Sequence, residues 1–157
     1  MILTGRNFDQ RYVPMKTNTL LDLIAALLIL LYVYTAASKW MDFEQFKVQM
    51  YGQALPVWLA HLLIFTLPGT ELLTAILLFF GRTRLAGCYL SAVLLLMFTG
   101  YVALAVFHFF DHVPCACGGV ISALGWKMHL IFNLFFLLLT ILAIKLHNRE
   151  RRTARFL

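Results

Sequence analysis

Four long apolar segments constrain the fold of this chain more than any other feature. They lie at residues 19–38, 57–80, 85–110 and 126–145, and each is long enough for a membrane-spanning helix, which needs about 20 apolar residues. Lipid offers no water to the backbone, so spanning segments must bond internally as helices. Charged residues make up only 13% of the chain, about half the share of roughly 25% in soluble domains. We therefore predict an all-α, polytopic membrane protein with a bundle of four transmembrane helices.

The basic residues predict the orientation of this bundle, because loops rich in Lys and Arg stay in the cytoplasm. Most of them cluster before the first span, between the second and third spans, and after the fourth span. These residues are Arg6, Arg11, Lys16, Arg82, Arg84, Lys145, Arg149, Arg151, Arg152 and Arg155. The other two connections hold only Lys39, Lys47 and Lys127. The net charge of +6 is thus a signal of topology rather than of nucleic-acid binding.

This pattern predicts a multi-pass protein of the bacterial inner membrane with both termini in the cytoplasm. Residues 1–18 would form a cytoplasmic lead, residues 19–146 the transmembrane domain, and residues 147–157 a basic cytoplasmic tail. The first and third connections would face the periplasm, and the lipid bilayer would be the main partner of the apolar surface.

The first connection predicts a short amphipathic helix. Its apolar residues recur at steps of three and four, with polar residues on the opposite face. The apolar set is Trp40, Phe43, Phe46, Met50 and Tyr51, and the polar set is Asp42, Gln45 and Gln49. We expect this helix to lie on the outer leaflet, either as an anchor of the loop or as a lid over the bundle.

The third connection contains the tripeptide Cys115-Ala116-Cys117. Two thiols at this spacing can bond to each other in a tight ring, to a partner's thiol, or to a metal. A disulfide across so small a ring is strained, and strained disulfides are the labile, oxidising ones. A charged His112 would stabilise the thiolate that attacks disulfides. These features favour thiol–disulfide exchange in the oxidising periplasm, with Cys115 and Cys117 as the reacting residues.

Polar residues near this loop form a candidate supporting cluster. His61, His108, His112 and His129 all map to the outer half of the spans, and Asn133 lies one helical turn after His129. Two interpretations stay open for the histidines. Each could simply be satisfied by water or a backbone carbonyl, or the four together could assist the Cys pair.

Glu71 is the other costly polar residue, because it lies inside the second span after Pro68-Gly69. We expect it to make a hydrogen bond that fixes helix packing rather than to transfer protons.

A metal site is an alternative use of the same atoms. Cys115, Cys117 and His112, with His108 or His129, together offer sulfur and nitrogen ligands to zinc or copper. Their spacing matches no established zinc framework, so this signal is the weaker one.

The segment from Cys115 to Asn133 resembles the region before the last helix in the MauE/DoxX group of small, redox-associated membrane proteins. The resemblance rests on the C-x-C pair, Trp126 and Asn133, and it extends over most of the chain. It implies a four-helix bundle similar to vitamin K epoxide reductase. In such bundles cysteines at an outer helix end exchange electrons with a thioredoxin-like protein and a quinone.

The same resemblance implies a role for Trp126 and Asn133 beside the Cys pair, and a disulfide-containing periplasmic client. A second Cys pair, which the fuller relay uses, is not evident in this sequence, so we expect another molecule to supply it. The function predicted first is therefore periplasmic thiol–disulfide exchange. An accessory subunit of a larger membrane complex is the second interpretation, and a metal-handling protein the third.

Overall fold

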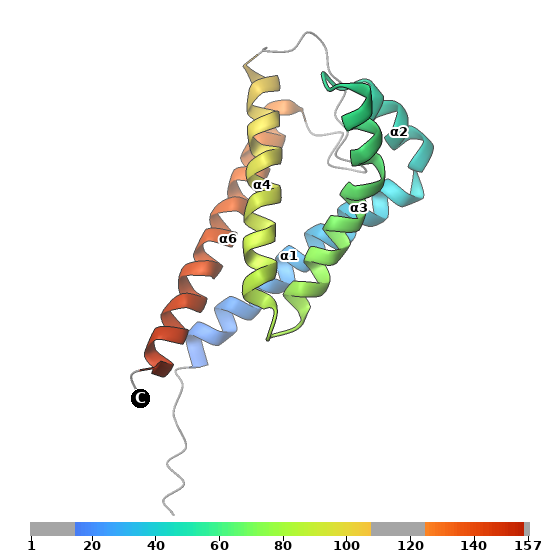
Figure 1. Ribbon diagram of the computed structural model, residues 1–157. Coiled ribbons are helices and arrows are strands. Elements are labelled where there is room, and N and C mark those ends of the chain that lie inside the picture. Colours follow the sequence, from blue (N-terminus) through green and yellow to red (C-terminus); the bar gives the residue numbers. More distant parts are fainter. Residues whose placement is uncertain (1–14, 108–124, 156–157) are drawn as a thin grey trace, which may run out of the picture.

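The computed structural model describes residues 15–107 and 125–155, and all its secondary-structure elements there are α-helices. They are α1 (Met15–Met41), α2 (Phe43–Tyr51), α3 (Val57–Phe79), α4 (Arg84–Val106) and α6 (Trp126–Arg155), and Figure 1 shows their arrangement. Four of them are long and apolar enough to cross a membrane. This confirms the predicted all-α fold with four transmembrane helices.

The helices that are long and apolar enough to span a membrane begin and end within a few residues of the predicted segments at most ends. They cover Thr19–Met41, Val57–Phe79, Arg84–Val106 and Trp126–Arg149. The third predicted span continued to residue 110, but α4 ends at Val106, and residues 108–110 lie outside the described residues. Helix α6 continues to Arg155, so much of the predicted basic tail is helical.

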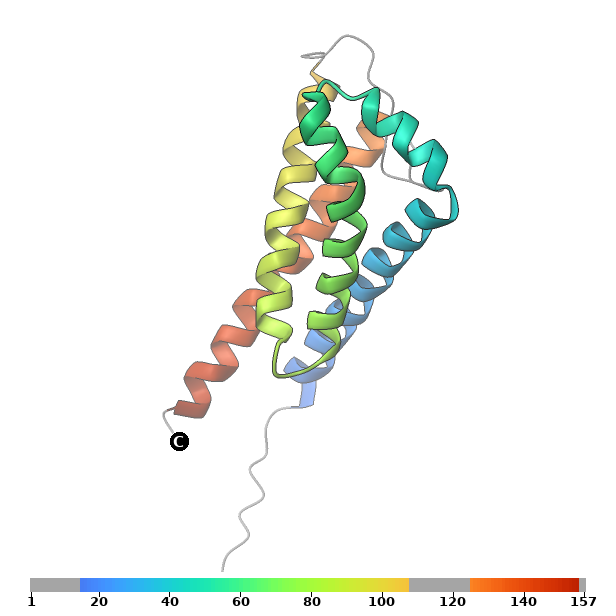
Figure 2. The ribbon, with the colours of Figure 1, turned by 45° about the vertical axis from the view of Figure 1, so that its right-hand side comes forward.

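The helices run alternately up and down the bundle. The start of α1, the turn between α3 and α4, and the end of α6 lie at one end, and the end of α4 and the start of α6 lie at the other (Figures 1 and 2). Helix α1 packs mainly against α3, and α4 mainly against α6. Because α1 is inclined, it ends partway along α3, and α2 completes the path to the start of α3 (Figures 1 and 2).

A close approach of two backbones fixes the pair α3 and α4. A methyl group added at Gly87 would lie 2.8 Å from the backbone nitrogen of Leu78 and 3.0 Å from the carbonyl carbon of Leu77. Both atoms belong to the backbone of α3, so they cannot turn aside as a side chain could. Small residues allow this kind of close packing between membrane helices.

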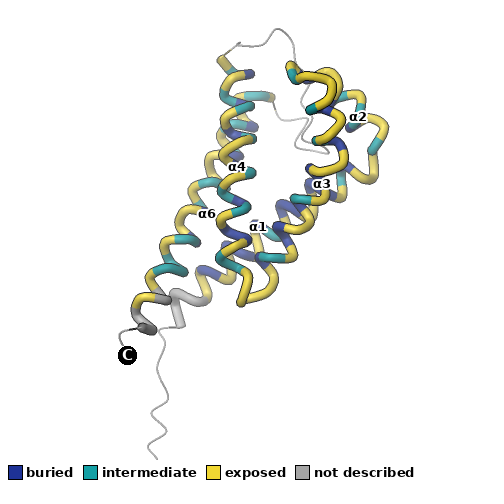
Figure 3. The backbone as a smooth tube through the Cα atoms, in the orientation of Figure 1, coloured by how far each residue is buried: buried dark blue, intermediate teal, exposed yellow. Residues whose placement is uncertain are grey.

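A chain of buried hydroxyl groups joins three helices in the core. The Tyr32 hydroxyl of α1 donates to Ser91 Oγ of α4 at 2.9 Å, and Ser91 Oγ lies 3.2 Å from Thr140 Oγ1 of α6. Apolar residues such as Leu28 and Leu78 surround this chain. Figure 3 shows that the buried residues follow the inner faces of the helices, while the outer faces are exposed.

Helix α2 forms within the predicted segment, and its apolar side chains point in more than one direction. Phe46 and Met50 are buried and pack with Ile64 of α3, whereas Val48 and Tyr51 are exposed. Part of the predicted apolar face therefore covers the protein itself. Its position on the outer leaflet stays a prediction.

Candidate functional site: a buried ion pair and a polar cavity

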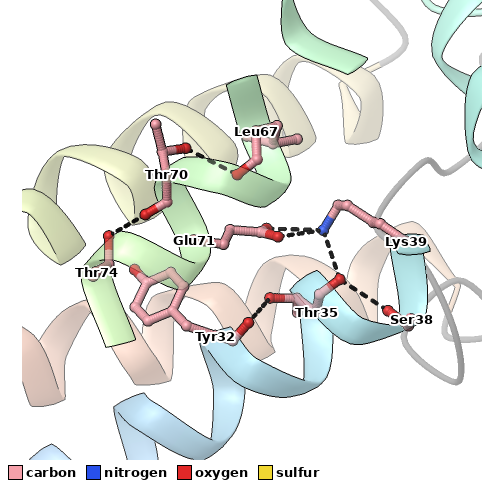
Figure 4. Close-up of polar contacts among 8 residues, drawn as sticks. All are labelled: Tyr32, Thr35, Ser38, Lys39, Leu67, Thr70, Glu71 and Thr74. Carbon is pink, nitrogen blue, oxygen red and sulfur yellow. Dashed lines mark hydrogen bonds and ion pairs between the residues drawn. The ribbon is translucent and has the colours of Figure 1, made fainter. Parts of the chain in front are cut away.

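A buried ion pair joins α1 to α3. Lys39 Nζ lies 2.8 Å from Glu71 Oε1 and 3.0 Å from Glu71 Oε2. The two side chains are only 2% and 3% exposed. Figure 4 shows both pointing toward each other between the two helices. In the low-dielectric interior, charges of opposite sign are tolerated mainly as such a pair.

The end of α1 satisfies the rest of the ammonium group. Lys39 Nζ also donates to the carbonyl oxygen of Thr35 at 3.3 Å, and the ring of Phe46 lies beside it, with its centroid 5.9 Å from Nζ. Ser38 Oγ donates to the same Thr35 carbonyl at 3.0 Å, as Figure 4 shows. An ammonium has three donors, and the two carboxylate oxygens and this carbonyl match that number.

The position of Lys39 corrects an assignment made from the sequence. The sequence pattern places Lys39 in the first connection, but α1 continues to Met41 and holds Lys39 inside the bundle. The inclination of α1 is the physical reason, because it brings the last turn of the helix against the middle of α3. The packing hydrogen bond expected for Glu71 is thus supplied by a cation 32 positions away in sequence.

A sequence signal for this pair did exist. Glu71 is a carboxylate inside a span, and Lys39 directly follows the apolar part of the first span. An unpaired charge of either sign in lipid is expensive. Matching the two charges would have suggested the contact, although it could not have predicted where along the two helices the contact lies.

A cavity of about 40 Å³ lies beside the ion pair, between α1, α3, α4 and α6. Six of its lining residues carry polar or charged groups, and the other four are apolar. The polar and charged residues are Tyr32, Thr35, Lys39, Glu71, His129 and Asn133. The apolar ones are Leu31, Leu95, Phe98 and Phe132.

Two residues of the predicted supporting cluster, His129 and Asn133, meet Glu71 at this cavity. His129 is 2% exposed and Asn133 is 6% exposed, and they lie one turn apart on the same face of α6. Trp126 is half-buried at the first residue of α6. His61 does not join them, because it is exposed on α3 with its ring against Phe65, at a centroid distance of 5.4 Å.

The remaining predicted residues, Cys115, Cys117, His108 and His112, lie outside the described residues. The metal alternative rests on these same four residues, or on His129 in place of His108. Within residues 15–107 and 125–155, no group of three or more His, Cys, Asp and Glu side chains is arranged to hold a metal. Cys88 is described, and it is a free, buried thiol near the start of α4.

The comparisons with known proteins identify a family for this chain. The family model for methylamine utilisation protein MauE matches residues 17–146. The chain belongs to the MauE family. The match covers the first three candidate spans of this multi-pass membrane protein, most of the fourth, and the connection that carries the Cys pair. No curated protein and no solved structure gave a match.

The family assignment confirms the MauE part of the resemblance drawn from the sequence. The likeness to DoxX proteins and to vitamin K epoxide reductase stays a prediction. So does the use of the Cys pair in this MauE-family chain.

Proposed function

We propose that this MauE-family protein exchanges disulfides at the periplasmic face of the bacterial inner membrane through Cys115 and Cys117. The supporting observation is the place of their connection in the bundle. The connection runs from the end of α4 at Val106 to the start of α6 at Trp126. These two helix ends lie at the opposite end of the bundle from the turn between α3 and α4, where the sequence has Arg82 and Arg84 (Figure 1). By the positive-inside rule the turn is cytoplasmic, and the Cys connection is then periplasmic, with both termini inside.

The proposed reaction is a two-electron exchange with a partner protein. In the oxidised form, a thiolate of the partner attacks one sulfur of the Cys115–Cys117 disulfide and forms a mixed disulfide. The partner's second thiol, as its thiolate, then attacks the mixed disulfide. The partner leaves with a disulfide, and Cys115 and Cys117 become thiols that have taken two electrons and, with solvent, two protons. The reverse sequence oxidises the pair again.

The partner must carry a second Cys pair. A periplasmic thioredoxin-like protein or a disulfide-containing client would supply it, and a second disulfide or a quinone would accept the electrons. The name of the family points to methylamine utilisation as the process in which the client acts. The strain of a disulfide closed over one intervening residue supports the role of an oxidant.

Trapping the mixed disulfide tests this proposal. The variants Cys115→Ser and Cys117→Ser each leave one thiol that can form a mixed disulfide but cannot resolve it. One of the two should accumulate a covalent adduct with a Cys-containing periplasmic protein, visible on non-reducing gels and lost on reduction. Cys88→Ser is the matched control, because Cys88 is buried in α4 and should leave exchange unchanged.

Two further measurements test the proposal, and a negative result in either would contradict it. A membrane-impermeant maleimide added to intact spheroplasts should label reduced Cys115 and Cys117 but not Cys88. Alkylation-shift on membranes should show the pair changing between oxidised and reduced forms. If the double variant Cys115→Ser/Cys117→Ser still supports client oxidation at the normal rate, the pair has no exchange role. The accessory-subunit interpretation would then be favoured.

A further inference from the structure

An unpaired amide in the cavity beside the ion pair indicates a binding site that the proposed thiol chemistry does not use. Asn133 is 6% exposed, and its side-chain Nδ2 has no hydrogen-bond partner among the described residues. Asn133 is also one of the residues that line the cavity. A buried amide donor left without an acceptor is costly, and such groups usually bind a partner or an ordered water.

The other groups around the cavity define the chemistry of this partner. The Tyr32 hydroxyl donates to Ser91, and the Thr35 hydroxyl donates to the Tyr32 carbonyl. Glu71, by contrast, keeps acceptor capacity, because a carboxylate offers about four lone-pair sites and Lys39 supplies only two contacts. A group that accepts from Asn133 and donates to Glu71 would satisfy both sides.

The size of the cavity selects among such groups. A water molecule needs roughly 10–15 Å³ of such space, and the cavity measures about 40 Å³. It therefore has room for about two or three waters. Most of the lining surface is apolar, but the Asn133 amide, the Glu71 carboxylate and the other polar groups there meet the second requirement for buried water, which is two to four hydrogen-bonding partners.

We propose that this cavity is a water-binding site, held by the Asn133 amide and the Glu71 carboxylate, that hydrates the ion pair between the helices. Water both donates and accepts, so it can connect the two groups whichever way the amide is turned. The site is independent of the Cys pair and goes beyond the proposed function.

The same water would give protons a path inside the bundle. The titratable groups that line the cavity are Tyr32 and Lys39 from α1, Glu71 from α3 and His129 from α6, and the α4 residues there are apolar. His129 lies in the first turn of α6. Water in the cavity therefore joins the imidazole at the outer end of α6 to the carboxylate of α3.

Radiolytic labelling in H₂¹⁸O tests the proposal directly, because hydroxyl radicals form from water at the position where it is bound. Tyr32 is 2% exposed and lines the cavity, and Phe46 is 3% exposed and is not among the lining residues. With water in the cavity, the intact protein in detergent or nanodiscs should incorporate ¹⁸O at Tyr32 several-fold faster than at Phe46. Equal rates at the two rings would overturn the proposal.

The variant Asn133→Leu tests the role of the amide. Leu has a similar volume and no hydrogen-bonding group, so labelling of Tyr32 should fall toward the rate at Phe46. The unfolding equilibrium constant should rise about tenfold, as for a lost buried hydrogen bond. A more stable variant would mean that the amide was unsatisfied in a dry cavity, and unchanged labelling would mean that Asn133 does not hold the water. If the variant does not fold, the wild-type labelling ratio decides alone.

Discussion

Neutralising one partner of the Lys39–Glu71 pair should destabilise the protein more than neutralising both. Lys39→Met and Glu71→Gln keep the approximate shape of each side chain and remove its charge. Each single variant leaves the other charge inside the bundle without its counter-ion, where the few waters proposed for the cavity cannot replace bulk hydration. The double variant removes both charges and leaves two neutral side chains.

The structure gives the size of the effect. Charge centres about 3–4 Å apart attract each other by about 4–6 kcal/mol at an effective dielectric constant of about 20, and the closest N–O contact is 2.8 Å. Desolvation of both charges offsets most of this attraction in the intact pair. Breaking one side of a buried pair costs about 3–5 kcal/mol, whereas replacing the whole pair is often close to neutral. We expect each single variant to lose about 3–5 kcal/mol and the double variant to lose less than either.

The measurement is the free energy of unfolding of the four proteins of this double-mutant cycle, by steric trapping in bilayers or by SDS titration of detergent-solubilised protein. A second ion pair on α2 is the matched control. Lys47 and Glu44 also approach to 2.7 Å, but their side chains are 32% and 84% exposed. The corresponding cycle, Lys47→Met with Glu44→Gln, should show a coupling of about 0.5 kcal/mol or less.

Additive losses would refute this reasoning. If the double variant loses the sum of the two single losses to within about 0.5 kcal/mol, the two groups do not interact. The pair would then not be the contact that holds the end of α1 against α3.

Further predictions concern the packing of α4. Gly87→Ala should lower the free energy of unfolding by about 1–3 kcal/mol, because the new methyl group meets the backbone at Leu78. Gly100→Ala in the same helix is the control and should be close to neutral, because its methyl group meets nothing within 4 Å. Unfolding curves of the two variants measure the difference, and equal losses would contradict the prediction. Tyr32→Phe should lower the free energy of unfolding by about 0.5–1.5 kcal/mol, because it removes the hydroxyl that donates to Ser91. An unchanged free energy of unfolding in the same assay would contradict this hydrogen bond.

The sequence predicted the helices well because the bilayer leaves few alternatives. A segment of about 20 apolar residues has to form a helix there, so the start of α3 at Val57 and the start of α6 at Trp126 agree with the predicted boundaries. The end of α4 is different. The apolar run continues past Val106, and composition alone gives no signal of a helix end inside such a run.

The candidate site was predicted only in part. The step of four residues from His129 to Asn133 places both on one face of a helix, and both do line the cavity. The spacing of His129 and Asn133 does not predict which residues of the other helices face them. The predicted depth in the outer half of the spans also grouped His61 with this cluster, but the orientation of α3 leaves His61 exposed beside Phe65.

The sequence by itself determined that this chain is a four-span membrane protein, because the cost of burying backbone polar groups in lipid depends only on local composition and length. It also identified Glu71 as a charge in need of a partner. Only the tertiary structure decided that the partner is Lys39, because the contact depends on the inclination of α1 and on the point along α3 where α1 ends. No local pattern encodes that crossing, which is set by how four helices pack together.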